Sequence, residues 1–289
     1  MPVAAAARVG LWSWSLNLPL VLCAVTAVLY RLGATAVRPH RRGAQRLRSA
    51  CFYAALVVLV VALSSPLDGY AEQLFWAHMV QHVLLLLVAA PLVVIARPWN
   101  QLWRCLPLEA RRPLARGLSQ RRGAAPLRAA SRFLGAPATS FALFSLVLLG
   151  WHLPVLFDAT LRSSFLHELE HSMFFLTAIM FFKQVIPSPP LRISLAAPQR
   201  VLYAIGAMIV SWVLAVVLAL AQHPLYAHYA HERARPGGLS ALADQQLAAG
   251  IMWVPGSITF LVIVFVYVHR WLTPSEPGRT RAPRLASER

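Results

Sequence analysis

The chain alternates between long apolar segments and short polar connections. A helix needs roughly 20 residues to cross the hydrocarbon core of a bilayer. Seven segments approach or exceed that length, and they cover residues 11–32, 50–65, 75–96, 138–153, 165–186, 199–222 and 245–271. The pattern predicts an all-α, polytopic membrane protein, with a bundle of seven transmembrane helices over residues 1–272 and a disordered tail over residues 273–289.

The composition agrees with a membrane protein. Hydrophobic residues make up 58% of the 289 residues and charged residues only 13%, whereas a soluble domain carries roughly 25% charged residues. There are too few polar side chains here to cover a water-soluble surface. Only Arg8 is basic ahead of the first apolar segment, and no small-residue cleavage site follows that segment. We therefore expect a retained helix rather than a signal peptide.

The basic residues are distributed unevenly across the predicted topology. The formal net charge is +17, and 23 of the 27 Lys and Arg residues fall in connections on one side of the bilayer. Because short connections rich in Lys and Arg stay cytoplasmic, we predict an outside N-terminus and a cytoplasmic C-terminal tail. The Arg-rich connection over residues 97–135 is expected to lie on anionic lipid headgroups. The charge thus indicates the lipid bilayer as its partner, and no nucleic acid.

Five of the ten histidines are predicted to lie at a similar depth in the outer half of the bundle. His78 and His82 are four residues apart, and so are His167 and His171, so each pair shares one face of its helix. His152 ends the apolar segment that lies between the two pairs. Ionisable side chains are costly inside a membrane and are mostly retained there for function. We therefore predict a metal site built from these five histidines.

The residues around these histidines bear on which metal would bind. Imidazole suits copper, zinc, iron and nickel, and a thioether favours Cu(I). The three cysteines are scattered and form no ligand pair. Candidate accessory groups are the thioethers of Met79 and Met252 and the carboxylates of Asp68, Glu170 and Asp244, which could accept hydrogen bonds from ligating imidazoles. Asp244 also fits the N-cap position of the last predicted helix.

The connection ahead of the last helix contains three further histidines, His223, His228 and His231. They could collect an incoming ion for the predicted site. They could equally be solvated loop residues without a role.

Two other functions are compatible with part of this pattern. Residues 167–171 read H-E-L-E-H, which fits the H-E-x-x-H signature of zinc proteases, with Glu168 as general base. The third histidine of the extended signature is missing after His171, and a second histidine pair would be superfluous in a three-ligand catalytic zinc site. Alternatively, histidines on facing helices could ligate a haem as in a membrane cytochrome.

Six short motifs, taken in order, resemble the caa(3)-type cytochrome c oxidase assembly factor family, usually called CtaG. They are Ser65–Asp68, His78–His82, Trp151–Pro154, Leu166–His171, Asp244–Gln246 and Gly250–Gly256. The resemblance runs from Ser65 to Trp271, whereas the Arg-rich connection and the tail carry no such motif.

The resemblance implies a seven-span protein of the bacterial plasma membrane that serves the maturation of a haem–copper oxidase. Copper is then the expected metal, although zinc stays possible, and the five histidines are the positions expected to hold it. The implied partners are oxidase subunits or a copper chaperone. The implied role is binding and transfer of the metal, so no enzymatic reaction is expected.

Overall fold

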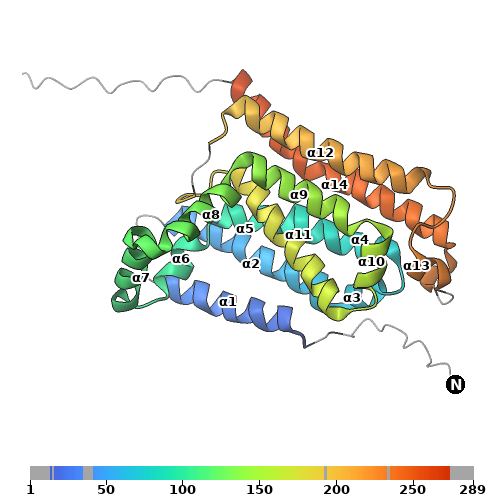
Figure 1. Cartoon of the computed structure of the whole chain (residues 1–289), viewed down its shortest axis with the longest axis horizontal. Helices are drawn as coiled ribbons and strands as arrows, with labels where there is room; N and C mark the ends of the chain where they lie inside the picture. The colour runs from blue at the N-terminus through green and yellow to red at the C-terminus, as the bar shows by residue number, and fades with distance from the viewer. Residues whose placement is uncertain (1–13, 15, 35–41, 192–193, 233–234, 274–289) are drawn as a thin grey trace, which may run out of the picture.

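The chain is largely helical in the part that the computed structural model describes, residues 14, 16–34, 42–191, 194–232 and 235–273 (Figure 1). No strand occurs among those residues, which confirms the all-α prediction. Seven helical stretches match the predicted segments: α1 (Leu18–Ala34), α2 (Arg42–Ser64), α4–η2–α5 (Phe75–Val83, Leu84–Ala89 and Ala90–Ala96), α9 (Pro137–Trp151), α11 (Ser164–Val185), α12 (Ala197–Leu220) and α14 (Ala241–Leu272). Residues 11–13 and 15 of the first predicted segment and 274–289 of the predicted tail lie outside the described residues.

Shorter helices connect these stretches. They are α3 (Pro66–Ala71), α6 (Trp99–Arg104), α7 (Leu108–Gln120), η3 (Arg122–Ala124), α8 (Ala125–Gly135), α10 (Pro154–Thr160), α13 (Ala227–His231) and η4 (Pro236–Gly238). In Figure 1, α6, α7 and α8 lie at one end of the bundle, and α3, α10 and α13 lie at the other.

Four helices are long and apolar enough to cross a membrane, namely residues 45–64 of α2, residues 75–96 of α4–η2–α5, α12 and α14. A fifth span results if residues 122–135 and α9, which meet at an angle of 70°, are counted together. Length and composition of the described helices therefore support a polytopic protein with four or five candidate spans. The count of seven spans and the orientation of the termini stay predictions.

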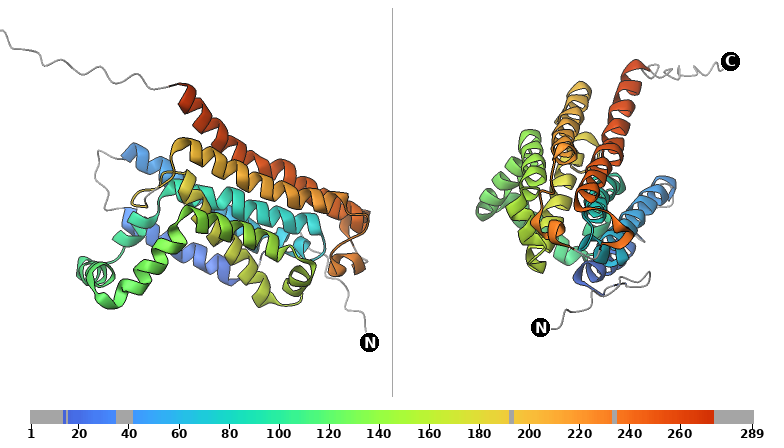
Figure 2. Two further views of the ribbon diagram at one scale, coloured as in Figure 1. Left: turned by 45° about the horizontal axis from the view of Figure 1, so that its top comes forward. Right: turned by 90° about the vertical axis from the view of Figure 1, so that its right-hand side faces the viewer.

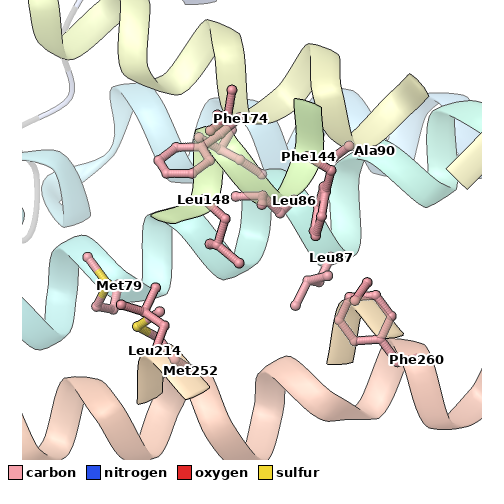
Figure 3. Packing of buried hydrophobic residues seen from close by; sticks show 14 of the residues in the cluster. Met79, Leu86, Leu87, Ala90, Phe144, Leu148, Phe174, Leu214, Met252 and Phe260 are labelled. Carbon is pink, nitrogen blue, oxygen red and sulfur yellow. The ribbon is translucent and has the colours of Figure 1, made fainter. Parts of the chain in front are cut away.

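The long helices pack side by side along one common direction (Figure 2). Helix α14 packs against both α12 and α4, α9 packs against α11, and α2 packs against α5. Buried apolar side chains from α4–η2–α5, α9, α11, α12 and α14 fill the space between them, as Figure 3 shows. This packing brings side chains of α4, α9 and α11, the helices that carry the five predicted histidines, next to one another.

A π-helical segment, η2, follows α4 and begins two residues after His82. The wider turn of a π-helix changes the direction of the following side chains, and such segments are frequent near functional sites. One carbonyl of this segment, that of Leu87, accepts a hydrogen bond of 2.8 Å from the hydroxyl of Thr259 on α14. The helix that carries His78 and His82 is thereby tied to α14 at its centre.

The Arg-rich connection forms helices of its own. No residue of α7 or α8 is buried, and the exposed large apolar side chains include Leu114, Leu118 and Phe133. Arginines and apolar side chains are therefore both accessible on these helices. Contact of α7 and α8 with lipid headgroups stays a prediction.

Candidate metal centre

The five predicted histidines meet where α4, α9 and α11 pack together. His78 and His82 lie on α4, His167 and His171 lie on α11, and His152 is the residue that ends α9. Neighbouring imidazole rings have centroids between 4.3 and 5.7 Å apart. Four of the rings are buried, and His167 is half-buried. The spacing of four residues in each pair thus places both rings of that pair toward the same junction.

One carboxylate joins three of these histidines. His78, His167, His171 and Glu170 each offer one ligand atom, and these four atoms lie within 4.8 Å of one another. Donors that share one ion at bond lengths of about 2.1 Å lie roughly 3–4 Å apart. Side-chain adjustments of less than about 1 Å would therefore bring all four atoms onto a single ion.

The polar atoms at this junction lack the partners that buried groups normally have. Both oxygens of Glu170, Nε2 of His167, Nε2 of His171 and Nδ1 of His82 are buried without a hydrogen-bond partner among the described residues. The two Glu170 oxygens lie 3.6 Å from Nε2 of His78 and 3.7 Å from Nε2 of His82, beyond ordinary hydrogen-bond length. Since a buried unpaired polar atom costs about 1–3 kcal/mol, several of them at one place fit a bound cation.

The hydrogen bonds of His78 determine which of its ring nitrogens can act as a ligand. Its Nδ1 lies 3.2 Å from the hydroxyl of Tyr229, and that hydroxyl donates its only proton to the carbonyl of Ala71. Nδ1 must therefore donate to the tyrosine oxygen, which leaves the lone pair of a neutral His78 on Nε2. That atom faces Nε2 of His82 at 3.0 Å and the Glu170 carboxylate. A ligating histidine in proteins typically has its other ring nitrogen fixed in this way.

The Asp244 carboxylate binds the start of α4, whereas the sequence predicted that it would bind an imidazole. Its two oxygens each accept a hydrogen bond of 2.9 Å, one from the backbone N–H of Phe75 and one from that of Trp76. A carboxylate at a helix N-terminus pairs with otherwise free N–H groups and with the helix dipole. The predicted N-cap role within its own helix is wrong, because Ser240 caps α14 by accepting from the N–H of Ala243. The carboxylate caps the helix of His78 from across the chain.

Asp68 lies at the edge of the junction. It accepts a hydrogen bond of 2.9 Å from the side-chain amide of Gln81, and the same amide donates to the carbonyl of Ala62. Burial raises the pKa of Asp68, while the Gln81 hydrogen bond and the nearby His167 act in the opposite direction. Asp68 therefore orients α4 through Gln81 and interacts with His167 electrostatically.

A family model described as cytochrome c oxidase caa3 assembly factor (Caa3_CtaG) matches residues 28–273. The chain belongs to this assembly factor family. The resemblance in the six motifs is thereby confirmed.

Two mycobacterial proteins are similar to this assembly factor family member over most of its length. They are the uncharacterised proteins Mb0105 of Mycobacterium bovis and MT0111 of Mycobacterium tuberculosis, each 24% identical over 269 residues. The alignment covers 91% of this chain and only 40% of each relative. No solved structure matches the chain.

In this assembly factor, His152 lies outside the group of His78, His167, Glu170 and His171. The ring of His152 neighbours that of His82, but Nε2 of His152 faces the sulfur of Met79 at 3.4 Å. Met252 lines a small cavity of about 30 Å³ together with His82 and His152. The two predicted accessory methionines thus lie on the His152 side of the junction.

The three loop histidines do not reach the junction. His228 bonds the backbone carbonyl of Glu72, His231 bonds that of Ala227, and His223 is exposed. Their role in collecting ions stays a prediction.

The same loop supplies two buried tyrosines that sequence reasoning missed. Tyr229 fixes His78, and the Tyr226 hydroxyl donates to the backbone carbonyl of His152 at 3.0 Å.

The H-E-x-x-H pattern is arranged differently from a zinc protease site. In that signature the glutamate directly after the first histidine serves as general base at the metal. Here Glu168 lines a mostly apolar cavity of about 360 Å³ that α1, α2, η2, α5, α6 and α11 enclose and that His171 also lines. The carboxylate that lies among the histidines is that of Glu170. The motif alone does not predict which of the two glutamate side chains points toward the histidines.

Proposed function

We propose that this protein binds a metal ion, with copper favoured over zinc, and passes it on during the assembly of a haem–copper oxidase. The ion would be held by His78, His167, Glu170 and His171. The observation that supports this most is the convergence of buried nitrogen and oxygen atoms without hydrogen-bond partners among the described residues. Membership of the assembly factor family supports the oxidase as the destination.

Copper is favoured for two chemical reasons. Divalent copper binds sites of nitrogen and oxygen ligands more tightly than zinc does. In addition, a thioether lies next to the histidines, since the sulfur of Met79 is 3.4 Å from His152. Histidine and methionine ligands exchange more readily than a closed set of cysteine thiolates, which suits transfer to a partner.

The proposal includes the topology and the partners. The protein would cross the bacterial plasma membrane seven times, with the N-terminus outside and the C-terminus in the cytoplasm, so that the metal group lies in the outer half. Oxidase subunits or a copper chaperone would exchange the ion with it. Binding and release require no chemical reaction, so the protein would not act as an enzyme.

Metal analysis of the purified full-length protein tests this proposal. We expect the unaltered protein to bind about one equivalent of divalent copper or zinc at this group, and we expect His171→Ala to lose it. His223→Ala is the matched control, because His223 is exposed and outside the group, and it should keep the metal. A protein that contains no metal and takes up neither ion on titration would overturn the proposal.

The same preparation separates the two alternatives. A Soret band in its absorption spectrum would indicate a cytochrome. Peptide cleavage that Glu168→Gln abolishes, with the metal still bound, would indicate a protease.

A further inference from the structure

His152 and Met79 make a buried contact that no ordinary hydrogen bond between neutral side chains explains. Nδ1 of His152 lies 2.7 Å from the carbonyl of Leu148, and a carbonyl can only accept, so Nδ1 carries the proton. The lone pair of the neutral ring is then on Nε2, which faces the Met79 sulfur at 3.4 Å. A thioether has no hydrogen to donate. Two electron-pair donors therefore face each other in a site closed to solvent.

A soft metal ion between the two atoms would account for this arrangement. With bonds of about 2.1 Å to nitrogen and 2.3 Å to sulfur, a separation of 3.4 Å corresponds to an angle of roughly 100° at the ion. That angle is close to the one found in tetrahedral coordination. The Leu148 carbonyl fixes the ring through its other nitrogen, as happens for ligating histidines in known metal sites.

We propose that His152 and Met79 form a second metal site, selective for Cu(I), beside the group of His78, His167, Glu170 and His171. The inference rests on the proposed function and adds a site of different chemistry. A thioether with imidazole selects Cu(I), whereas a carboxylate with imidazoles suits divalent ions. The structure thus contains a hard and a soft ligand set next to each other.

Further ligands for the second site are at hand. His82, His152 and Met252 line a cavity of about 30 Å³, and a single water-sized species needs about 10–15 Å³. Figure 3 shows Met79 and Met252 projecting from facing helices, α4 and α14. Met252 therefore supplies a second thioether at this cavity.

His82 connects the two sites. Its Nε2 faces His78 at 3.0 Å and Glu170 at 3.7 Å, on the side of the four-residue group. Its Nδ1 is buried without a hydrogen-bond partner among the described side chains, and the ring also lines the cavity beside His152. A ring with one nitrogen directed at the first group and the other still free could exchange an ion between the two sites.

Titration of the purified full-length protein with Cu(I), under anaerobic reducing conditions and against a chromogenic Cu(I) chelator, tests the second site. Zn²⁺ is titrated in parallel as a probe of the four-residue group. We expect Met79→Leu, a change of similar volume, to weaken Cu(I) binding at least tenfold and to leave Zn²⁺ affinity within twofold. Met208→Leu is the matched control, since Met208 is a buried methionine of α12, whereas the sulfur that faces His152 is that of Met79, and the change should alter neither affinity.

X-ray absorption of the Cu(I)-loaded protein gives a second readout that does not depend on how a variant folds. We expect a sulfur scatterer at about 2.3 Å in the unaltered sequence, replaced by selenium after selenomethionine labelling. Copper coordinated only by nitrogen and oxygen would overturn the second site, and so would unchanged Cu(I) affinity in Met79→Leu. If Zn²⁺ binding is retained in that case, the proposed function survives and only this inference fails. If neither ion binds the unaltered protein, both fail.

Discussion

At one end of the bundle, around α3, α10 and α13, polar side chains are buried and directed at particular atoms. At the other end, none of the residues of α7 and α8 is buried, and several of their arginines, Arg112 and Arg116 among them, are exposed. The first end depends on individual contacts, such as the two bonds from Asp244 to the start of α4. At the second end, we expect lipid binding to depend on the number of arginines more than on the position of any one of them. A single substitution should therefore be severe at the first end and mild at the second.

The largest effect is expected from Asp244→Ala. The substitution removes two charge-assisted hydrogen bonds from the start of α4, and such bonds contribute roughly 1.5–3 kcal/mol each. We expect the free energy of unfolding in detergent to fall by about 3–6 kcal/mol. Ser240→Ala, which removes only the local cap of α14, should cost about 1 kcal/mol. Equal losses in the two variants would contradict the account of Asp244.

A smaller effect is expected from Tyr229→Phe. The change removes the hydroxyl that fixes the ring of His78 and leaves the packing almost unaltered. Loss of such an outer hydrogen bond typically lowers metal affinity about 10–100-fold, which competitive Zn²⁺ titration would measure. Tyr203→Phe serves as the control, because that hydroxyl donates to the carbonyl of Pro137 away from the histidines. Equal affinity in both variants would show that His78 needs no such support.

At the opposite end, we expect a modest loss of lipid binding, and no other change, from Arg112→Gln and from Arg116→Gln. Both arginines are exposed on α7. A basic residue near an anionic bilayer contributes about 1 kcal/mol, so retention of anionic lipid in native mass spectrometry should fall about fivefold for each. Metal affinity should stay unchanged. A lower metal affinity in either variant would remove the contrast between the two ends.

The smallest effect is expected at the loop histidines. His228 and His231 bond backbone carbonyls and do not reach the junction. The double change His228→Ala with His231→Ala should alter equilibrium metal affinity less than twofold. A slower rate of metal uptake at unchanged affinity would support the collecting role that the sequence suggested. A large loss of affinity would place these histidines among the ligands.

The sequence predicted the helices and the side chains that meet better than it predicted their individual contacts. Pairs spaced by four residues had to share a helix face, so His78, His82, His167 and His171 could be expected to point together. The choice between Glu168 and Glu170 depends on how α11 is rotated against its neighbours, which periodicity does not specify to within one residue. The role of Asp244 depends on bonds to residues 168 and 169 positions away, so no local pattern could reveal it. Two tyrosines three residues apart in a histidine-rich loop were the available signal for Tyr226 and Tyr229.

The most direct test of the metal group compares Glu170→Gln with Glu168→Gln. The two residues lie on the same helix, two positions apart, and only Glu170 lies among the histidines. We predict that the divalent copper or zinc bound by the four-residue group is lost in Glu170→Gln and retained in Glu168→Gln. Retention in Glu170→Gln together with loss in Glu168→Gln would contradict the account.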